Sequence, residues 1–121
     1  MANIRTSLDA VMTIDGAVGA SIVDVESGVP LGTVGGDDLD MELAAAASTV
    51  VVQEELDLID NLDLQQTPED ILISLDDQYH LLRFFHETGD VFTYLVLDRA
   101  DANLALARRQ LENVDQDLAL E

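Results

Sequence analysis

Three segments rich in β-branched and aromatic residues follow one another between residues 70 and 98 and lead into a helical pattern. The joints between them are short and carry turn residues, Asp76 and Asp77 at the first and a Glu-Thr-Gly-Asp segment at 87–90 at the second. Connections this short join antiparallel neighbours. The sequence therefore predicts a three-stranded antiparallel meander followed by a final helix.

The N-terminal part carries the pattern of a helix and a hairpin. Apolar residues recur at helical spacing over residues 4–12, and Gly16 is expected to end this short helix. Residues 18–25 and 29–34 are expected to pair as a hairpin. Pro30 places the second of these strands at a sheet edge, because proline cannot donate a hydrogen bond to a central ladder.

A long helix is predicted between the hairpin and the meander, over residues 38–61, with the acidic segment 37–38 capping its start. One apolar stripe runs along its whole length. A second stripe, which contains Leu43 and Val50, lies nearly opposite in the N-terminal half only. A helix on a sheet buries one stripe, so another element or a second molecule has to cover the other. The three adjacent valines at 50–52 leave a strand as the alternative for that part.

These elements predict one α/β (α+β) domain over residues 1–121, in the order α-β-β-α-β-β-β-α. A five-stranded antiparallel sheet with helices on both faces satisfies this order. A chain of 121 residues is long enough to bury a sizeable core. No linker or internal repeat interrupts the pattern.

The charge and the missing residue types argue against several function classes. The formal net charge is -20, from 25 acidic and 5 basic residues, which makes nucleic acid a poor partner. All the basic residues are arginine, so a phosphate-binding lysine and lysine Schiff-base chemistry are excluded. The composition is typical of a high-GC actinobacterium or a salt-adapted host. No apolar run approaches the length of a signal sequence or membrane span, so we expect a cytoplasmic protein without membrane insertion.

No set of residues has the spacing of a catalytic or metal site. Cysteine is absent, and His80 and His86 are predicted on one face of a single strand, roughly 20 Å apart, too far to share a metal. The acidic clusters lie where helices begin and hairpins turn, which favours capping and turn roles over cation binding. We therefore expect no catalytic residue, no cofactor and no metal, and we interpret the protein as not an enzyme.

Several local strings resemble the roadblock/dynein light chain family. Residues 19–28 (GASIVDVESG) resemble its first strand and glycine turn, where Gly28 supplies the reversal. Residues 43–47 (LAAAA) resemble its central helix, and residues 94–98 (YLVLD) resemble its fifth strand. Residues 79–83 (YHLLR) and the lysine-free acidic composition are similar to actinobacterial members. The resemblance covers nearly the whole chain and implies a roadblock/profilin-like sandwich.

The resemblance also implies a homodimer in which the sheets join edge to edge through residues 71–75 and the central helices pair. The expected interface residues are Leu39, Leu43, Ala44, Ala46, Ala47, Val50, Ile71 and Ile73. The two apolar stripes of the central helix support such pairing independently. The alternative is that the alanine run reflects helix propensity alone.

The implied function is a non-enzymatic dimeric scaffold or regulator that binds a small Ras-like GTPase, with co-encoded signalling proteins as further partners. The alternative is a small-ligand sensory domain of profilin-like fold. Such a domain needs an apolar cavity, and the few aromatic residues of this chain do not indicate one.

Overall fold

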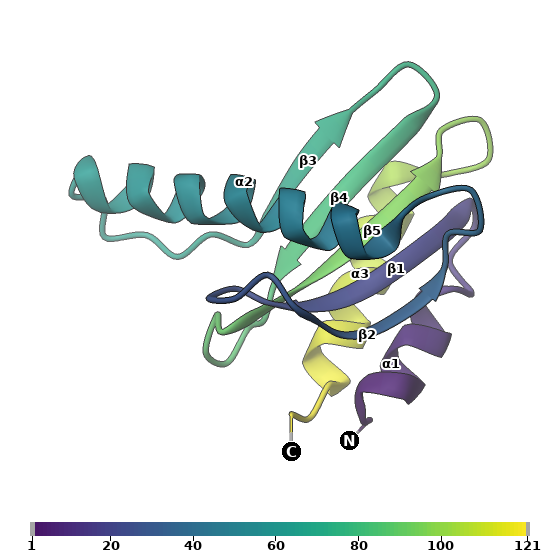
Figure 1. Ribbon diagram of the computed structural model, residues 1–121, viewed down its shortest axis with the longest axis horizontal. Coiled ribbons are helices and arrows are strands. Elements are labelled where there is room, and N and C mark those ends of the chain that lie inside the picture. Colours follow the sequence, from purple (N-terminus) through teal and green to yellow (C-terminus); the bar gives the residue numbers. More distant parts are fainter. Residues whose placement is uncertain (1, 121) are drawn as a thin grey trace.

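The computed structural model describes residues 2–120, which form a five-stranded antiparallel sheet and three helices. The strand order is β2-β1-β5-β4-β3, so β2 and β3 are the two edges, as the sequence predicts (Figure 1). The strands are β1 (Ala17–Asp24), β2 (Pro30–Gly35), β3 (Asp70–Ser74), β4 (Gln78–Phe84) and β5 (Val91–Asp98).

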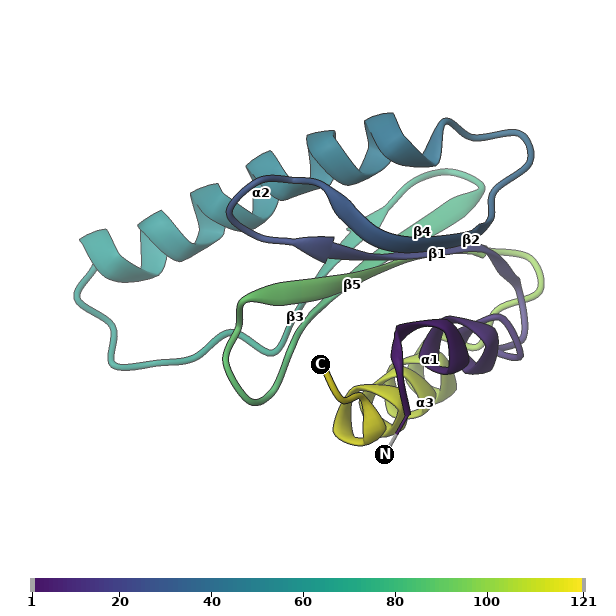
Figure 2. The same cartoon turned by 60° about the horizontal axis from the view of Figure 1, so that its bottom comes forward.

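The helices cover both faces of the sheet, which confirms the predicted fold class and element order. α2 (Met41–Asn61) crosses one face, while α1 (Ile4–Val11) and α3 (Leu104–Asp117) lie side by side on the other (Figure 2). The two ends of the chain meet beside α1 and α3, where Ala2 bridges Leu118. No helix within residues 2–120 has the length and apolar character needed to cross a membrane.

Alternation along the strands divides the core into two clusters, one on each face of the sheet. The cluster beneath α2 contains Val23, Met41, Ala45, Val52, Leu82, Phe84, Phe92, Tyr94 and Val96. The cluster beneath α1 and α3 contains Leu8, Val11, Ile14, Ala20, Ile22, Leu81, Phe85, Val91, Leu95, Leu97, Ala107, Leu111 and Leu118. Neighbouring residues such as Leu81 and Leu82 therefore belong to different layers.

The start of α2 differs from the prediction. Residues 37–39 form a turn in which the Leu39 amide donates to the Gly36 carbonyl at 2.8 Å, and the helix begins at Met41. The cap is Asp40, whose side chain accepts a hydrogen bond from the Leu43 amide at 3.1 Å. The strand alternative for residues 50–52 is wrong, because these residues lie inside α2 with Val52 fully buried.

α2 is longer than the sheet it crosses. Its N-terminal half packs mainly on β1, whereas its C-terminal half extends past the sheet (Figures 1 and 2). Both the outward side of α2 and its projecting end are therefore left open by the described residues.

Candidate interaction surface

The outward side of α2 is apolar along its first three turns. Leu43 is 65% exposed and Val50 is 58% exposed, and Ala46 and Ala47 are exposed between them. Side chains at these spacings share one side of a helix. We call Leu43, Ala46, Ala47 and Val50 the outer α2 face, and no described residue of the chain covers it.

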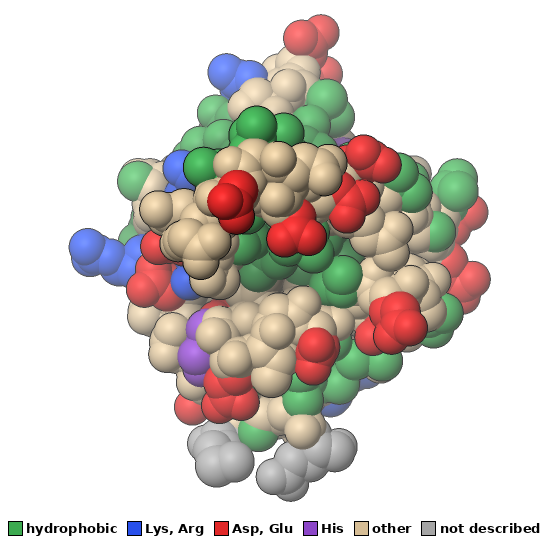
Figure 3. Space-filling view, turned by 90° about the vertical axis from the view of Figure 1, so that its left-hand side faces the viewer, with side chains coloured by type: hydrophobic (Ala, Val, Ile, Leu, Met, Phe, Trp, Pro, Cys, Tyr) green, Lys and Arg blue, Asp and Glu red, His purple; other side chains and the backbone are tan. Residues whose placement is uncertain are grey.

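Apolar side chains continue onto the projecting end of α2, which the sequence analysis missed. Leu58 is 49% exposed, and Leu62 and Leu64, which follow it in the chain, are exposed as well. The signal was present in the sequence, since Leu58 keeps the helical spacing from Leu43, but Glu54 and Asp57 interrupt the stripe. Figure 3 shows apolar and acidic side chains interspersed on this side of the molecule.

The other predicted interface residues lie partly inside the α2-side cluster. Leu39 and Ala44 are half-buried against it, at the N-terminal end of α2. Ile71 and Ile73 are half-buried on β3, on the side of the sheet that α2 crosses. Within the described residues β3 pairs only with β4, so its outer backbone edge is free.

The Gly28 turn lies against α2. Gly28 has φ +74°, a conformation that favours glycine, and its amide donates to the Asp24 carbonyl at 2.8 Å. The Ser27 hydroxyl and amide both donate to the Asp24 carboxylate, which lowers the pKa of Asp24. The Gln53 side chain donates to the Val25 carbonyl at 2.7 Å. The β1–β2 hairpin is thereby tied to the middle of α2.

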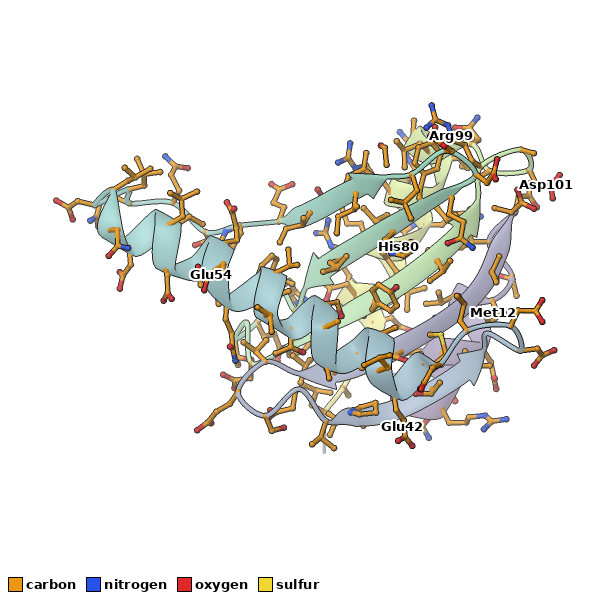
Figure 4. The ribbon with its side chains drawn as sticks, turned by 45° about the horizontal axis from the view of Figure 1, so that its top comes forward. Met12, Glu42, Glu54, His80, Arg99 and Asp101 are labelled. Atoms are coloured by element: carbon orange, nitrogen blue, oxygen red, sulfur yellow. The ribbon has the colours of Figure 1, made fainter. Side chains whose placement is uncertain are left out.

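A histidine lies on the open part of the sheet beside α2. The Tyr94 hydroxyl is 3.1 Å from His80 Nδ1, and His80 Nε2 is 3.1 Å from the Gln78 side-chain oxygen (Figure 4). A neutral ring that accepts from Tyr94 at Nδ1 and donates to Gln78 from Nε2 satisfies both contacts. Burial lowers the pKa of His80 and raises the pKa of Tyr94, which favours this neutral pair.

A buried ionic cluster on the opposite face of the sheet joins β4 to α3. Asp115 of α3 is only 3% exposed. Its carboxylate accepts from the His86 amide and lies 3.0 Å from His86 Nδ1, with Arg83 Nε at 3.8 Å. Burial raises the pKa of Asp115, and the charges of His86 and Arg83 and the hydrogen bonds from His86 oppose that rise.

His86 therefore does not share a strand with His80. β4 ends at Phe84, and His86 turns toward α3 while His80 lies on the α2 side. Within residues 2–120 no group of three or more acidic or histidine side chains is arranged to hold a metal ion.

Comparison with solved structures identifies the architecture. The sequence matches no protein-family model and no curated protein. The structure aligns with MglB of Myxococcus xanthus at TM-score 0.82 and 15% identity, covering 94% of this chain and 89% of that one. It aligns with a roadblock/LC7 domain from Streptomyces avermitilis at TM-score 0.82 and 8% identity, covering 96% and 94%. MglC of Myxococcus xanthus aligns at TM-score 0.62 and 19% identity, covering 94% of each chain.

The alignments with MglB and with the Streptomyces domain extend over most of both chains. The resemblance inferred from the local sequence strings is confirmed at the level of the fold. This chain has the fold of roadblock/LC7 domain proteins.

Proposed function

We propose that this protein is a non-enzymatic roadblock-type scaffold or regulator, which pairs with a second copy of itself and binds a small Ras-like GTPase. The observation that carries the proposal is the outer α2 face, an apolar surface that the described residues leave open. Exposed apolar side chains in a row are costly to leave in water and indicate contact with another protein surface.

A second copy is the occupant that this surface favours. Ala46 and Ala47 lie between Leu43 and Val50, and small side chains allow two helices to approach closely. The free edge of β3 can pair with the β3 of a second copy, which would extend the sheet. A related solved structure, described as MglB with tetrameric arrangement, aligns at TM-score 0.67 and 13% identity, so this fold supports self-assembly elsewhere.

The GTPase partner comes from the roadblock resemblance. The net negative charge of this protein would suit a dimer of it to a partner with basic patches, because opposite charges speed association. α2 contains none of the five arginines, which are Arg5, Arg83, Arg99, Arg108 and Arg109. A GTPase docked on α2 would therefore meet no arginine of this helix. We expect any effect on GTP hydrolysis to come from rearrangement of the GTPase's own residues.

Light scattering of the purified chain tests the pairing. We expect a dimer for the natural sequence and a monomer for Leu43→Asp, because the variant would bury a carboxylate in an apolar interface. Leu106→Asp is the matched control, since Leu106 is also an exposed helical leucine but belongs to α3. A natural chain that is monomeric at high concentration would overturn the pairing.

Binding assays with purified small GTPases test the partner. GTPases encoded beside this protein would be loaded with GDP or with a GTP analogue and titrated against it. We expect binding that depends on the nucleotide. Absence of binding to every such GTPase, with an intact dimer, would reject the GTPase assignment and leave self-assembly standing.

A further inference from the structure

Three of the five arginines of this acidic chain line one hollow between α3 and the β3–β4 edge. The hollow measures about 670 Å³ and is lined by Glu69, Asp70, Arg83, Ala105, Arg108, Arg109, Glu112 and Asn113. It lies on the α1–α3 side of the sheet, away from the outer α2 face. Figure 3 shows basic side chains grouped at one margin of the molecule, near a histidine, with acidic side chains among them.

Arg83 is the innermost cation of the hollow. The residue is only 9% exposed, and its Nε is buried with no hydrogen-bond partner among the described residues. Its contact with Asp115 is an ion pair at 3.8 Å, which is too long for a hydrogen bond. No described residue accepts a hydrogen bond from the other guanidinium nitrogens of Arg83 either. Only Nε is buried, so the terminal guanidinium nitrogens can meet an acceptor from outside the chain at the hollow.

The other two arginines differ from each other. Arg108 donates to the Asp70 carboxylate at 3.1 Å, which neutralises both side chains and leaves Asp70 occupied. Arg109 is exposed and has no hydrogen bond or ion pair with a described residue. Two guanidinium groups, one buried and one at the surface, are therefore available at the same hollow.

The carboxylates of the hollow do not cancel these two cations equally. Glu69 and Glu112 are exposed, so water and salt screen their charges. Arg83 is buried, where charges interact more strongly than in water, and its counter-charge is Asp115 at 3.8 Å. The planar guanidinium presents paired N–H donors that match the oxygens of a carboxylate or phosphate.

We propose that this hollow binds a small oxyanion, held by the guanidinium groups of Arg83 and Arg109. Carboxylates and phosphates share the required chemistry. Its lining residues belong to β4, α3, the start of β3 and the segment before it, so the site does not include the outer α2 face.

Titration of the natural chain with inorganic phosphate and, separately, with succinate tests the proposal. Sodium chloride keeps the ionic strength constant, because screening alone changes the stability of a chain with net charge -20. Calorimetry measures binding, and the arginine Nε–Hε signals in a ¹⁵N spectrum report which side chains respond. We expect saturable binding of at least one anion, with a shift of the Arg83 signal. The anion that binds identifies the class.

Variants separate the site from general charge effects. Arg109→Gln removes an arginine without a structural partner, and we expect the affinity to fall about tenfold, the loss of one charge-assisted hydrogen-bond pair. Arg83→Gln should abolish binding if the variant folds. Arg5→Gln, the matched control on α1, should leave the affinity unchanged within about twofold. The proposal is overturned if neither anion binds saturably, or if Arg109→Gln binds as tightly as Arg5→Gln.

Discussion

His86 Nδ1 lies 3.0 Å from a carboxylate oxygen of Asp115, and this contact joins the segment after β4 to α3. The His86 amide donates to the same carboxylate at 3.2 Å, and Arg83 supplies a positive charge from β4. A buried carboxylate is stable only when such partners surround it. Asp115 thus holds one helix to the sheet by polar contacts within an otherwise apolar layer.

We expect Asp115→Asn to lower the free energy of unfolding by about 3 kcal/mol, because it leaves Arg83 buried without a counter-charge. Urea denaturation measures the change. Glu112→Gln is the control on the same helix, and its exposed side chain should give a change below about 0.5 kcal/mol. Equal effects of the two substitutions would show that the buried cluster does not stabilise the fold.

His80 predicts a pH dependence of stability. Because burial lowers the pKa of His80 from its usual 6.5, the unfolded chain binds a proton more readily than the folded chain. The contribution of His80 to the free energy of unfolding is therefore full above pH 6.5. It is lost as the pH falls through 6.5 toward the lower pKa of the folded state. Urea unfolding of the natural chain and of His80→Gln, compared from about pH 5 to 8, isolates this effect.

The expected result is that the difference in unfolding free energy between the natural chain and His80→Gln shrinks as the pH is lowered. Burial favours the neutral ring, and the Tyr94 hydroxyl, 3.1 Å from His80 Nδ1, can donate a hydrogen bond to it. A difference that stays constant across the range, or grows at low pH, would contradict the assignment.

Gly35→Ala should destabilise the protein by about 3 kcal/mol. Gly35 has φ +66°, and a Cβ built there would lie 2.6 Å from the Val18 carbonyl oxygen. Gly89→Ala is the matched control, with φ +71° but no atom within 4 Å, and should cost only about 1 kcal/mol. Thermal unfolding of both variants separates backbone strain from the steric clash, and similar losses would rule the clash out.

The N-terminal cap of α2 can be tested by two neighbouring aspartates. Asp40→Ala should cost about 1 kcal/mol, because it removes the side chain that accepts from the Leu43 amide. Asp38→Ala, at the position where the sequence pattern places the cap, should leave the unfolding free energy unchanged in urea titrations. The reverse order would support a helix that begins earlier than Met41.

Salt should strengthen the proposed dimer. Two copies with a net charge of -20 each repel one another, and added salt screens this repulsion while leaving the apolar contact of the outer α2 face intact. Sedimentation at about 50 and about 500 mM NaCl should show the dissociation constant falling about threefold or more. A dissociation constant that rises with salt would indicate that ion pairs, not apolar contacts, hold the two copies together.

Much of the fold could be predicted because its signals are local. Period-2 alternation and short turns identify the meander, Pro30 marks an edge strand, and the spacing of Leu43 and Val50 indicates an open second face of the central helix. The residue at which α2 begins could not be predicted from the sequence as accurately. Asp37, Asp38 and Asp40 are all good caps by residue type, and backbone geometry selects Asp40.

The sequence by itself determined the order of elements, the apolar stripes and the absence of cysteine and lysine chemistry, since each depends on residues near one another in the chain or on composition. Only the tertiary structure decided that Asp115 is buried, that His86 faces α3 while His80 faces Tyr94, and that three arginines share one hollow. These contacts join residues 14 to 38 positions apart, and helical or strand periodicity carries no information about which distant side chains meet across a sheet.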